Sequence, residues 1–485
     1  MDGSGGLVRE GRLTMLDETD GTAALELHPE RANPGQRRLI SADANRLLPA
    51  DRPMHAWYRF VLSFPPQLVR QYLHRFAIVP GQHVLDPFCG TGTTIVECKK
   101  MGIAAIGLEA NPMAHFASKV KATWTPDPEG LEVHAGRVAA LAGSRLAAAG
   151  IEDQAALFWR PDSEITLRSL PPEAHSLLLT NSISPLPLHK TLVLLECMRE
   201  LEDERYHEHE LLALANALVS TVGNLNFGPE VGVGPLKPDA PVLTTWLSRV
   251  QAMVRDLRQI RVQAYIDADC VVHLADARRV AGVLAPCSVD AVVTSPPYPN
   301  EKDYTRTTRL ESVLLGFIRN KSELRALKHG LVRSNTRGVY KGDDDERWVA
   351  HISEVQRLAT DIEARRLALG KTSGFERMYP KVAKLYFGGM ARHLSELRTC
   401  LRPGARLAYV VGDQASYLRV MIRTGQILGT IAQSIGYEVE SIDLHRTRLA
   451  TATREQLREE VVVLRWPGDK INTQMTPRAA GERER

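Results

Sequence analysis

Two glycines and two acids in the stretch from Val84 to Glu109 have the types and spacing of a site for a charged small molecule. The run VLDPFCGTGTT ends an apolar stretch in Asp86 and places Gly90 and Gly92 in a turn that opens a helical pattern. Because glycine has no Cβ, the backbone can turn tightly there and let a ligand approach its amide groups at the helix start. A second apolar run ends at Glu109, whose carboxylate can accept hydrogen bonds from a ribose diol.

A dinucleotide site is the main alternative, and two features weigh against it. The dinucleotide fingerprint needs a third glycine three residues after the second, where this chain has Ile95. Asp86 would repel a pyrophosphate, but it would attract the cationic amino-acid part of a cofactor such as S-adenosylmethionine. The stretch therefore favours S-adenosylmethionine. The plainer alternative, a structural glycine turn of an α/β protein, fits a string of this length less well.

A second string, Ser295-Pro296-Pro297-Tyr298, has residue types that suit group transfer to a planar amine. The amine of cytosine or adenine shares its lone pair with the ring, so it is a poor nucleophile. It gains positive charge as it attacks a methyl sulfonium, and acceptors must receive its protons. The hydroxyl of Ser295 and the carbonyl of Pro296 can accept them, the prolines stiffen the loop, and Tyr298 offers a ring face for a flipped base. This chemistry needs no metal and no covalent intermediate. The alternative for the string alone is a rigid turn after a strand.

Seven apolar runs predict the strands that must hold these loops. The first two runs end at Asp86 and at Glu109. The other five span Cys270–Leu274, Val289–Val293, Ala405–Val411, Glu438–Leu444 and Glu459–Leu464. With helical patterns between most of them, they predict an α/β fold with a mostly parallel sheet and an antiparallel last pair. Such sheets bind ligands at the carboxyl ends of their strands, where both strings lie.

The two strings also resemble those of a known family. DPFCGTGTT at 86–94 and TSPPY at 294–298 resemble the cofactor motif and the catalytic motif of S-adenosylmethionine-dependent DNA amino-methyltransferases, which modify cytosine N4 or adenine N6. The resemblance implies a Rossmann-like, seven-stranded class I methyltransferase sheet. Because the cofactor motif comes first in this chain, the motif order is expected to be unpermuted, with a helical insert between the second and third strands.

The resemblance also assigns roles to residues. The first motif would hold the methionine part of the cofactor, Glu109 its ribose and Asp276 its adenine, while the second motif would hold the target base. A segment before the glycine loop resembles a preceding cofactor motif of the family. The expected cofactor-binding residues are Phe64, Pro65, Asp86, Pro87, Phe88, Gly90, Gly92, Thr93, Thr94, Glu109 and Asp276, and the expected catalytic residues are Ser295, Pro296, Pro297 and Tyr298.

Ser295 guides the expected substrate. Within the resembled family, serine at the first catalytic position is more common for cytosine N4, and aspartate or asparagine for adenine N6. We therefore expect a site-specific methyltransferase of double-stranded DNA acting on cytosine N4. The alternatives are adenine N6, an RNA or protein amine, and a catalytically silent module that binds nucleic acid. Methylation at carbon 5 would need a Pro-Cys after the fourth strand, whereas Pro286-Cys287 precedes it.

Composition limits the remaining possibilities. The 485 residues are 44% hydrophobic and 24% charged, which is typical of a soluble globular protein. No apolar stretch is long enough to span a bilayer and the start lacks signal-peptide features, so we expect a cytoplasmic protein with no membrane partner. Six cysteines without paired spacing indicate reduced thiols. The resemblance suggests a restriction-modification setting. The chain has no convincing nuclease signature, so restriction or defence-system subunits would be separate polypeptides.

The order of these patterns along the chain predicts its domains. Residues 1–50 are expected to form an N-terminal arm, 51–119 and 266–466 the catalytic domain, 120–265 a helical insert and 467–485 a flexible tail. Residues 300–406 carry 22 basic against 13 acidic residues, a net +9, whereas residues 120–264 carry 13 against 18, a net −5. Because phosphates attract positive charge, DNA recognition is assigned to the basic segment 300–400.

Three local patterns in these regions receive plain interpretations. The stretch from Asn224 to Pro241 is rich in proline and glycine and predicts a loop. The string His207-Glu208-His209-Glu210 could suggest a metal site, but alternate residues of a helix do not face each other, so we expect a solvated polar face. The acidic run Asp343–Glu346 predicts a solvated loop tip and helix start.

Overall fold

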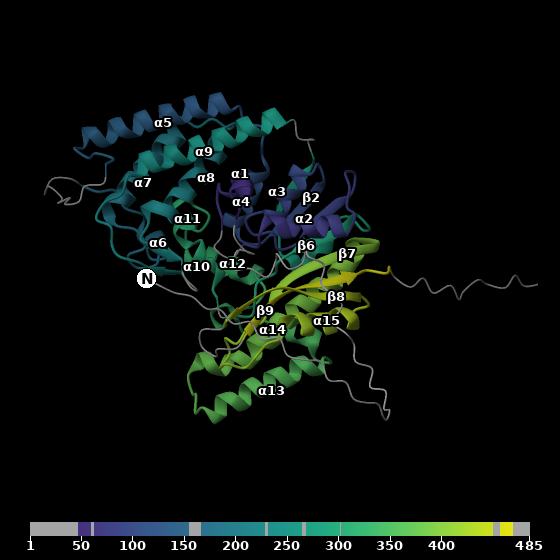
Figure 1. The fold of residues 1–485 in the computed structure, drawn as a ribbon. Helices are drawn as coiled ribbons and strands as arrows, with labels where there is room; N and C mark the ends of the chain where they lie inside the picture. The colour runs from purple at the N-terminus through teal and green to yellow at the C-terminus, as the bar shows by residue number, and fades with distance from the viewer. Residues whose placement is uncertain are drawn as a thin grey trace, which may run out of the picture. The chain divides into compact units, whose positions relative to one another are not determined.

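A sheet of seven strands carries both predicted loops, and helices cover its two faces (Figure 1). The computed structural model describes residues 47–59, 63–154, 166–227, 231–263, 268–300, 302–449 and 456–468. All of these belong to one compact unit, Ile40–Arg485. Most of the predicted arm and of the predicted tail lies outside the described residues.

The strands follow the seven apolar runs. They are β1 His83–Asp86, β2 Ala104–Glu109, β5 Cys270–Leu274, β6 Val289–Thr294, β7 Leu401–Gly412, β8 Glu438–Leu449 and β9 Gln456–Arg465, in the order β5-β2-β1-β6-β7-β9-β8. The first five strands in this order pair in parallel, and β9 runs antiparallel to both β7 and β8. The predicted Rossmann-like α/β sheet, with its antiparallel last pair, is confirmed.

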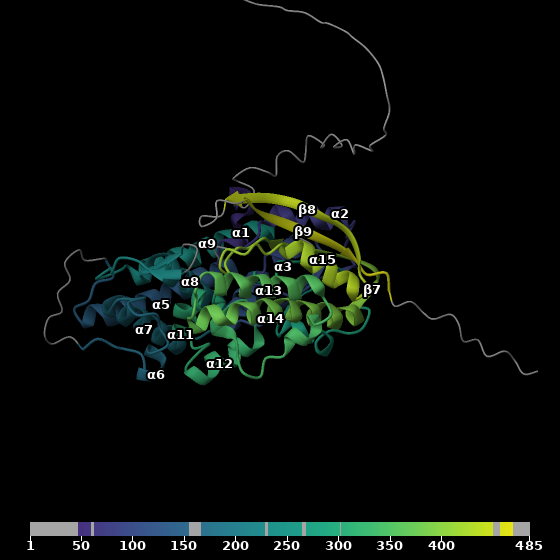
Figure 2. The same cartoon turned by 90° about the horizontal axis from the view of Figure 1, so that it is seen from below.

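Side chains alternate between two cores, one on each face of the sheet. Val84, Ala291 and Val293 pack with helices α2 Pro66–Arg75 and α3 Thr93–Lys100. Their neighbours Leu85 and Val292 point the other way, where α13 Ser353–Ala368, α14 Gly374–Leu397 and α15 Thr424–Ser434 cover the sheet (Figure 2). Because the central strands are buried on both faces, they are continuously apolar in the sequence.

The other helices outside the insert are mostly short. They are the 3-10 helices η2 Pro49–Asp51, η4 Ala277–Gly282, η5 Thr336–Gly338, η6 Asp345–Val349 and η7 Arg398–Cys400, and the α-helices α1 Arg52–His55, α4 Pro112–Ala122, α10 Tyr304–Thr307, α11 Arg309–Leu314 and α12 Lys321–Gly330. Pro66 and Pro112 each begin their helix, where a missing amide hydrogen costs nothing.

The predicted insert is helical. Its helices are α5 Pro128–Ala148, α6 Pro172–His175, α7 Pro185–Glu200, α8 His207–Ala217 with the π-turn η3 Leu218–Val222, and α9 Val242–Gln263. Their core, centred on the fully buried Trp246, also contains Met54, Phe116 and Leu310 from outside the insert. The insert therefore shares its core with α1, α4 and α11. The predicted loop at Asn224–Pro241 is wrong in part, because Leu225–Phe227 (β3) and Val231–Val233 (β4) form a small antiparallel sheet there.

The polar string of α8 is less solvated than predicted. His209 and Glu210 are only 2% and 0% exposed. The Nε2 atom of His209 lies 3.0 Å from the carbonyl oxygen of Thr123, and Oε1 of Glu210 lies 2.7 Å from Nδ1 of His134. The reason is that α8 packs against both α4 and α9, so part of its first turn is enclosed. No cluster of three or more His, Cys, Asp or Glu side chains suited to a metal occurs among the described residues.

The acidic run before α13 is also partly buried, contrary to prediction. Asp345 is 5% exposed and pairs with Arg278 at 2.7 Å and with Arg392 at 3.2 Å. This depends on close contact between two backbones, because a Cβ built on Gly388 of α14 would lie 2.0 Å from the carbonyl oxygen of Asp345. Within the described part of the chain, no helix is long and apolar enough to cross a membrane.

This contact gives a stability prediction. Gly388→Ala should lower the free energy of unfolding by about 1 to 3 kcal/mol, because the new methyl group meets backbone that cannot easily move. Gly389→Ala is the matched control, since its Cβ would come no closer than 3.3 Å to a side-chain methyl of Val332. Alanine is also the better helix former by about 1 kcal/mol, so this control should stay within about 1 kcal/mol of the wild type. Thermal unfolding of both variants checks the difference, and equal midpoints would contradict it.

Candidate active site

The glycine loop joins β1 to α3, and its two glycines serve different purposes. Gly92 precedes the first residue of α3 with φ at +82°, and a Cβ there would lie 2.4 Å from the hydroxyl oxygen of Ser118. Gly90 has φ at +52° and open space where a Cβ would point. Both conformations favour glycine, but only Gly90 combines this with room for a ligand.

Hydrogen bonds tie the glycine loop to the proline loop. Thr294 donates from Oγ1 to Oδ1 of Asp86 at 2.6 Å, and Thr94 donates from Oγ1 to the carbonyl oxygen of Val293 at 3.0 Å. The parent strands β1 and β6 are neighbours in the sheet. The two loops consequently begin side by side at one edge.

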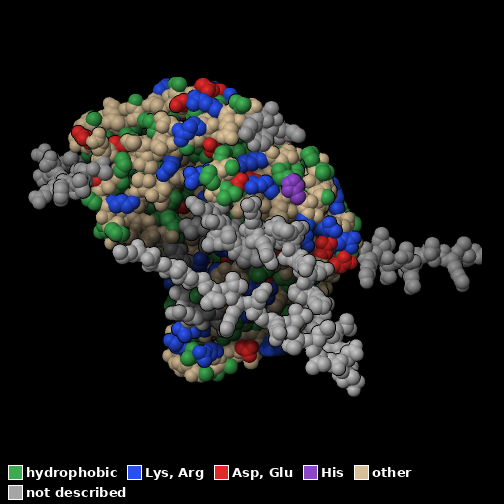
Figure 3. All heavy atoms as spheres, in the orientation of Figure 1, with side chains coloured by type: hydrophobic (Ala, Val, Ile, Leu, Met, Phe, Trp, Pro, Cys, Tyr) green, Lys and Arg blue, Asp and Glu red, His purple; other side chains and the backbone are tan. Residues whose placement is uncertain are grey.

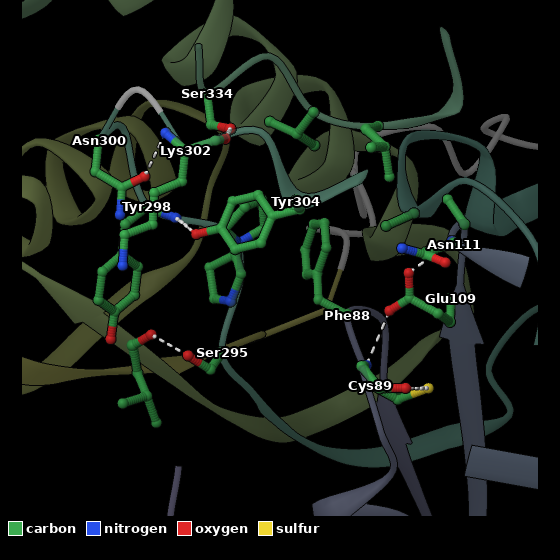
Figure 4. A pocket seen from close by; sticks show the side chains of 18 of the residues that line it. Phe88, Cys89, Glu109, Asn111, Ser295, Tyr298, Asn300, Lys302, Tyr304 and Ser334 are labelled. Carbon is green, nitrogen blue, oxygen red and sulfur yellow. Dashed lines mark hydrogen bonds between the residues drawn. The ribbon is translucent and has the colours of Figure 1, made fainter. Parts of the chain in front are cut away.

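Both loops open into a single cavity of about 520 Å³ (Figure 4). Eleven of the fifteen predicted site residues line it: Phe64, Pro87, Phe88, Gly90, Thr93, Glu109, Asp276, Ser295, Pro296, Pro297 and Tyr298. Pro65, Asp86, Gly92 and Thr94 are not in the lining. They lie behind it, where Asp86 and Thr94 tie the loops together, Gly92 packs on Ser118 and Pro65 caps α2.

Two backbone amides hold the carboxylate of Glu109 in the lining. Its carboxylate accepts backbone hydrogen bonds from Gly90 at 2.9 Å and from Asn111 at 2.7 Å. Burial raises the pKa of Glu109 to about 7, although both bonds act in the opposite direction. The carboxylate therefore changes charge near neutral pH, and only its ionised form is purely an acceptor.

Asp86 adds a second buried negative charge. It is 0% exposed, and burial raises its pKa to about 6 while the bonds from Thr294 and the Phe88 amide lower it. Its second oxygen, Oδ2, is buried and has no hydrogen-bond partner among the described residues. A cation arriving next to the loop would favour the ionised form, which fits an ammonium group.

Neighbouring side chains hold both Asp276, which was predicted to bind adenine, and Phe88 of the glycine loop. Asp276 lines the cavity, but its two oxygens also accept from the backbone and the guanidinium of Arg278, at 2.8 to 3.1 Å. The ring centroids of Phe88 and His393 lie 4.9 Å apart, and the two rings are packed edge to face. That imidazole is fixed from both sides, 2.8 Å from the Ala277 carbonyl and 2.7 Å from the Tyr409 hydroxyl. Phe88 is thereby given one orientation at the cavity wall.

Ser295 and Tyr298 are positioned by neighbouring strands. Ser295 donates its hydroxyl hydrogen to the carbonyl oxygen of Val410 at 3.1 Å, so toward any further group it acts as an acceptor (Figure 4). The backbone amide of Tyr298 donates to the hydroxyl of Tyr304 at 3.2 Å. The Tyr298 ring lies against Gly412, where a Cβ would be only 2.9 Å from the ring. An acceptor and an aromatic ring thus stand together beside the glycine loop.

Comparisons with known proteins agree with this arrangement. Residues 43–119, which include the glycine loop, match the family model N6_N4_Mtase, described as DNA methylase. The chain is 25% identical over 458 residues to the Type II methyltransferase M.BsoBI of Geobacillus stearothermophilus, covering 88% of this chain and 86% of that protein. It is 24% identical over 463 residues to the Type II methyltransferase M.AvaI of a Nostoc species, with 89% of each chain covered. The family model and both relatives support an N4/N6 amino-methyltransferase.

One solved structure is also similar to this methyltransferase, though only distantly. The rRNA methyltransferase aviRa from Streptomyces viridochromogenes covers 89% of this chain and 93% of its own, at 11% identity and a TM-score of 0.28. The methyl donor of the amino-methyltransferase is S-adenosylmethionine, and the acids Asp86 and Glu109 fit its ammonium group and ribose hydroxyls.

The methyltransferase cavity also contains residues that sequence reasoning did not identify. They come from the segment after the proline loop, from α12 and the loop that follows it, from the loop after β7, and from β8 and β9. Among them are Asn300, Lys302, Tyr304, Lys328, Arg333, Asn335, Gln414, His445, Arg446, Arg448 and Glu459. Arg446 and Arg448 lie just beyond the predicted strand Glu438–Leu444, and their alternation was an available signal that the strand continues, because residues two apart share a face.

The pKa of Glu109 predicts how cofactor affinity depends on pH. S-adenosylmethionine should bind more tightly as the pH rises from about 6 to about 8, because Glu109 must lose its proton to accept from the ribose hydroxyls. Glu109→Gln should remove the step near neutral pH and weaken binding by roughly tenfold at the upper end.

Calorimetry of both proteins across the pH range measures this effect. The difference between them isolates Glu109 from the titrating groups of the cofactor itself. Parallel pH profiles for the wild type and the glutamine variant would contradict the assignment.

Proposed function

We propose that the protein transfers a methyl group from S-adenosylmethionine to the exocyclic amine of a base flipped out of double-stranded DNA, at N4 of cytosine. The observation that carries the proposal is the shared cavity. The glycine loop and Ser295–Tyr298 line it together, from the ends of neighbouring strands. A base amine placed beside Ser295 would face the methyl group of a cofactor held by the glycine loop.

The residues of the proline loop would prepare the amine for attack. S-adenosylmethionine supplies a methyl group on a positively charged sulfur. Ser295 Oγ and the Pro296 carbonyl would accept the two amine hydrogens, which orients the nitrogen lone pair and stabilises its growing positive charge. The nitrogen forms a bond to the methyl carbon, the carbon–sulfur electron pair stays on sulfur, and one amine proton leaves to water. Tyr298 would stack on the base.

The choice of cytosine over adenine rests on Ser295. Its hydroxyl hydrogen is engaged with the Val410 carbonyl, so it offers a neutral acceptor rather than the carboxylate or amide more common for adenine. The string after the fourth strand contains no Pro-Cys nucleophile, which argues against attack at carbon 5. Adenine N6 remains the alternative within the same chemistry.

Double-stranded DNA as the substrate is supported by the relatives and by the cavity lining. Both relatives are Type II methyltransferases, and we propose the same restriction-modification setting here, with restriction activity on a separate chain. Lys302, Lys328, Arg333, Arg446 and Arg448 line the cavity and could contact phosphates near a flipped base.

The basic segment is proposed to contact DNA mainly through its first half. In its second half, α13 and α14 pack on the sheet, so one face of each helix is turned toward the core. On the face seen in Figure 3, basic side chains lie in several separate groups rather than in one patch. The part around α12, next to the cavity, is better placed to meet the duplex.

Incubation with labelled cofactor tests the substrate directly. Purified protein and tritiated S-adenosylmethionine are offered duplex DNA, RNA or protein, and the modified base is identified by mass spectrometry. We expect label in duplex DNA as N4-methylcytosine. N6-methyladenine would overturn the choice of base, and label confined to RNA or protein would overturn the substrate. Failure to bind S-adenosylmethionine in calorimetry would point to a catalytically silent module that binds nucleic acid.

Ser295→Ala should lower the methylation rate by about 100-fold or more, because one acceptor for the amine is lost where charge develops. Cofactor affinity should stay within about twofold of the wild type, since Ser295 is expected to contact the base rather than the cofactor. Ser288→Ala, at the opposite end of the same strand, is the control and should keep the full rate. Single-turnover kinetics and calorimetry measure both quantities, and an undiminished rate in Ser295→Ala would refute the mechanism.

A further inference from the structure

Two cations beneath the glycine loop lack the acidic partners that the fold provides for comparable cations. Lys121 on α4 is 1% exposed, and Arg59 is half-buried in the segment before α2. Neither has a carboxylate within ion-pair distance among the described residues. By contrast, the equally buried Lys190 pairs with Asp239 at 2.8 Å, and Lys100, near Lys121, pairs with Glu97 at 3.3 Å.

The hydrogen bonds of Lys121 place its charge directly behind the glycine loop. Its Nζ donates to the carbonyl oxygen of Thr91 at 2.5 Å and to that of Tyr58 at 3.2 Å. Thr91 lines the cavity between the two loop glycines. One turn earlier on α4, Ser118 supports Gly92. The same face of α4 therefore supports the loop and supplies a buried ammonium.

Arg59 brings the second charge to the same place from another segment. Its guanidinium donates to the carbonyl oxygen of Ser63 at 3.2 Å. The hydroxyl of Ser63 lies 3.5 Å from that of Thr91, and both residues line the cavity. Arg59 is close enough to Lys121 for the two charges to repel, which, after burial, is the next cause that lowers the pKa of Lys121.

A buried ammonium next to a half-buried guanidinium, with no counter-ion, is costly, and a bound anion would offset that cost. S-adenosylmethionine carries one anionic group, the carboxylate of its methionine part. We propose that Lys121 and Arg59 supply the positive charge that binds this carboxylate at the Ser63–Thr91 end of the cavity, with Lys121 acting as a positioning residue from behind Thr91. The zwitterion would then be recognised at both ends, since Asp86 suits its ammonium.

The alternative is that Lys121 only stabilises the loop by bonding two carbonyl groups. The two roles differ in one measurable respect. A lysine that merely supports the loop affects every ligand of the cavity alike, whereas a charge directed at the carboxylate affects only ligands that carry it.

Calorimetry with two ligands separates these roles. Dissociation constants are measured for S-adenosylmethionine and for decarboxylated S-adenosylmethionine, with the wild type, Lys121→Met and Arg59→Met. The control is Lys119→Met, on the same helix but exposed and paired with Glu208 at 2.6 Å. The proposal concerns the cofactor alone and the experiment contains no DNA, so its outcome is independent of the substrate proposed above.

The wild type and Lys119→Met should prefer the carboxylated ligand by about tenfold or more, the size expected for a charge-assisted contact. Lys121→Met and Arg59→Met should raise the dissociation constant of S-adenosylmethionine by a similar factor. The same variants should change the dissociation constant of the decarboxylated ligand by less than about threefold. Equal weakening of both ligands, or no change in either, overturns the proposal. Where Lys121→Met shows no cooperative unfolding transition, Arg59→Met decides by the same criterion.

Discussion

The site depends on the pairing of two strand ends. β1 and β6 lie side by side, and the hydrogen bonds from Thr294 to Asp86 and from Thr94 to the Val293 carbonyl join the loops that follow them. These bonds are buried, where an unpaired polar group would be costly, so the loops cannot move apart without exposing or orphaning their partners. This constraint holds the glycine loop and the proposed base-binding loop within reach of each other.

Burial shifts the pKa values of the ionisable groups in and behind the cavity. Asp86 is fully buried and Glu109 is partly buried, and the pKa values of both acids are raised toward neutrality, while Lys121 is a buried cation whose pKa is lowered. Each lacks a direct ion-pair partner among the described residues. The pKa of such an unpaired group shifts strongly when a ligand of opposite charge binds next to it. A zwitterionic cofactor supplies both signs at once.

In the helical insert and in the acidic run, tertiary packing buries polar side chains that the local sequence predicts to be solvated. Glu210 is buried by the helices packed on α8, and its partner is His134. Asp345 is buried against the backbone at Gly388 of α14, and its partner is Arg278. Neither partner is near in sequence. A helix pattern or a run of acids therefore could not reveal that these side chains are enclosed.

The sequence by itself determined the strands, the two loops at their ends and most of the cavity lining. Short apolar runs bounded by turn residues favour buried strands, and glycine or proline at their ends restricts the turns that follow. Only the tertiary structure decided which site residues face the cavity and which lie behind it. It also decided that Arg446 and Lys328 line the cavity and that Lys121 lies behind the glycine loop, because the surroundings of a side chain depend on elements that are distant in the sequence.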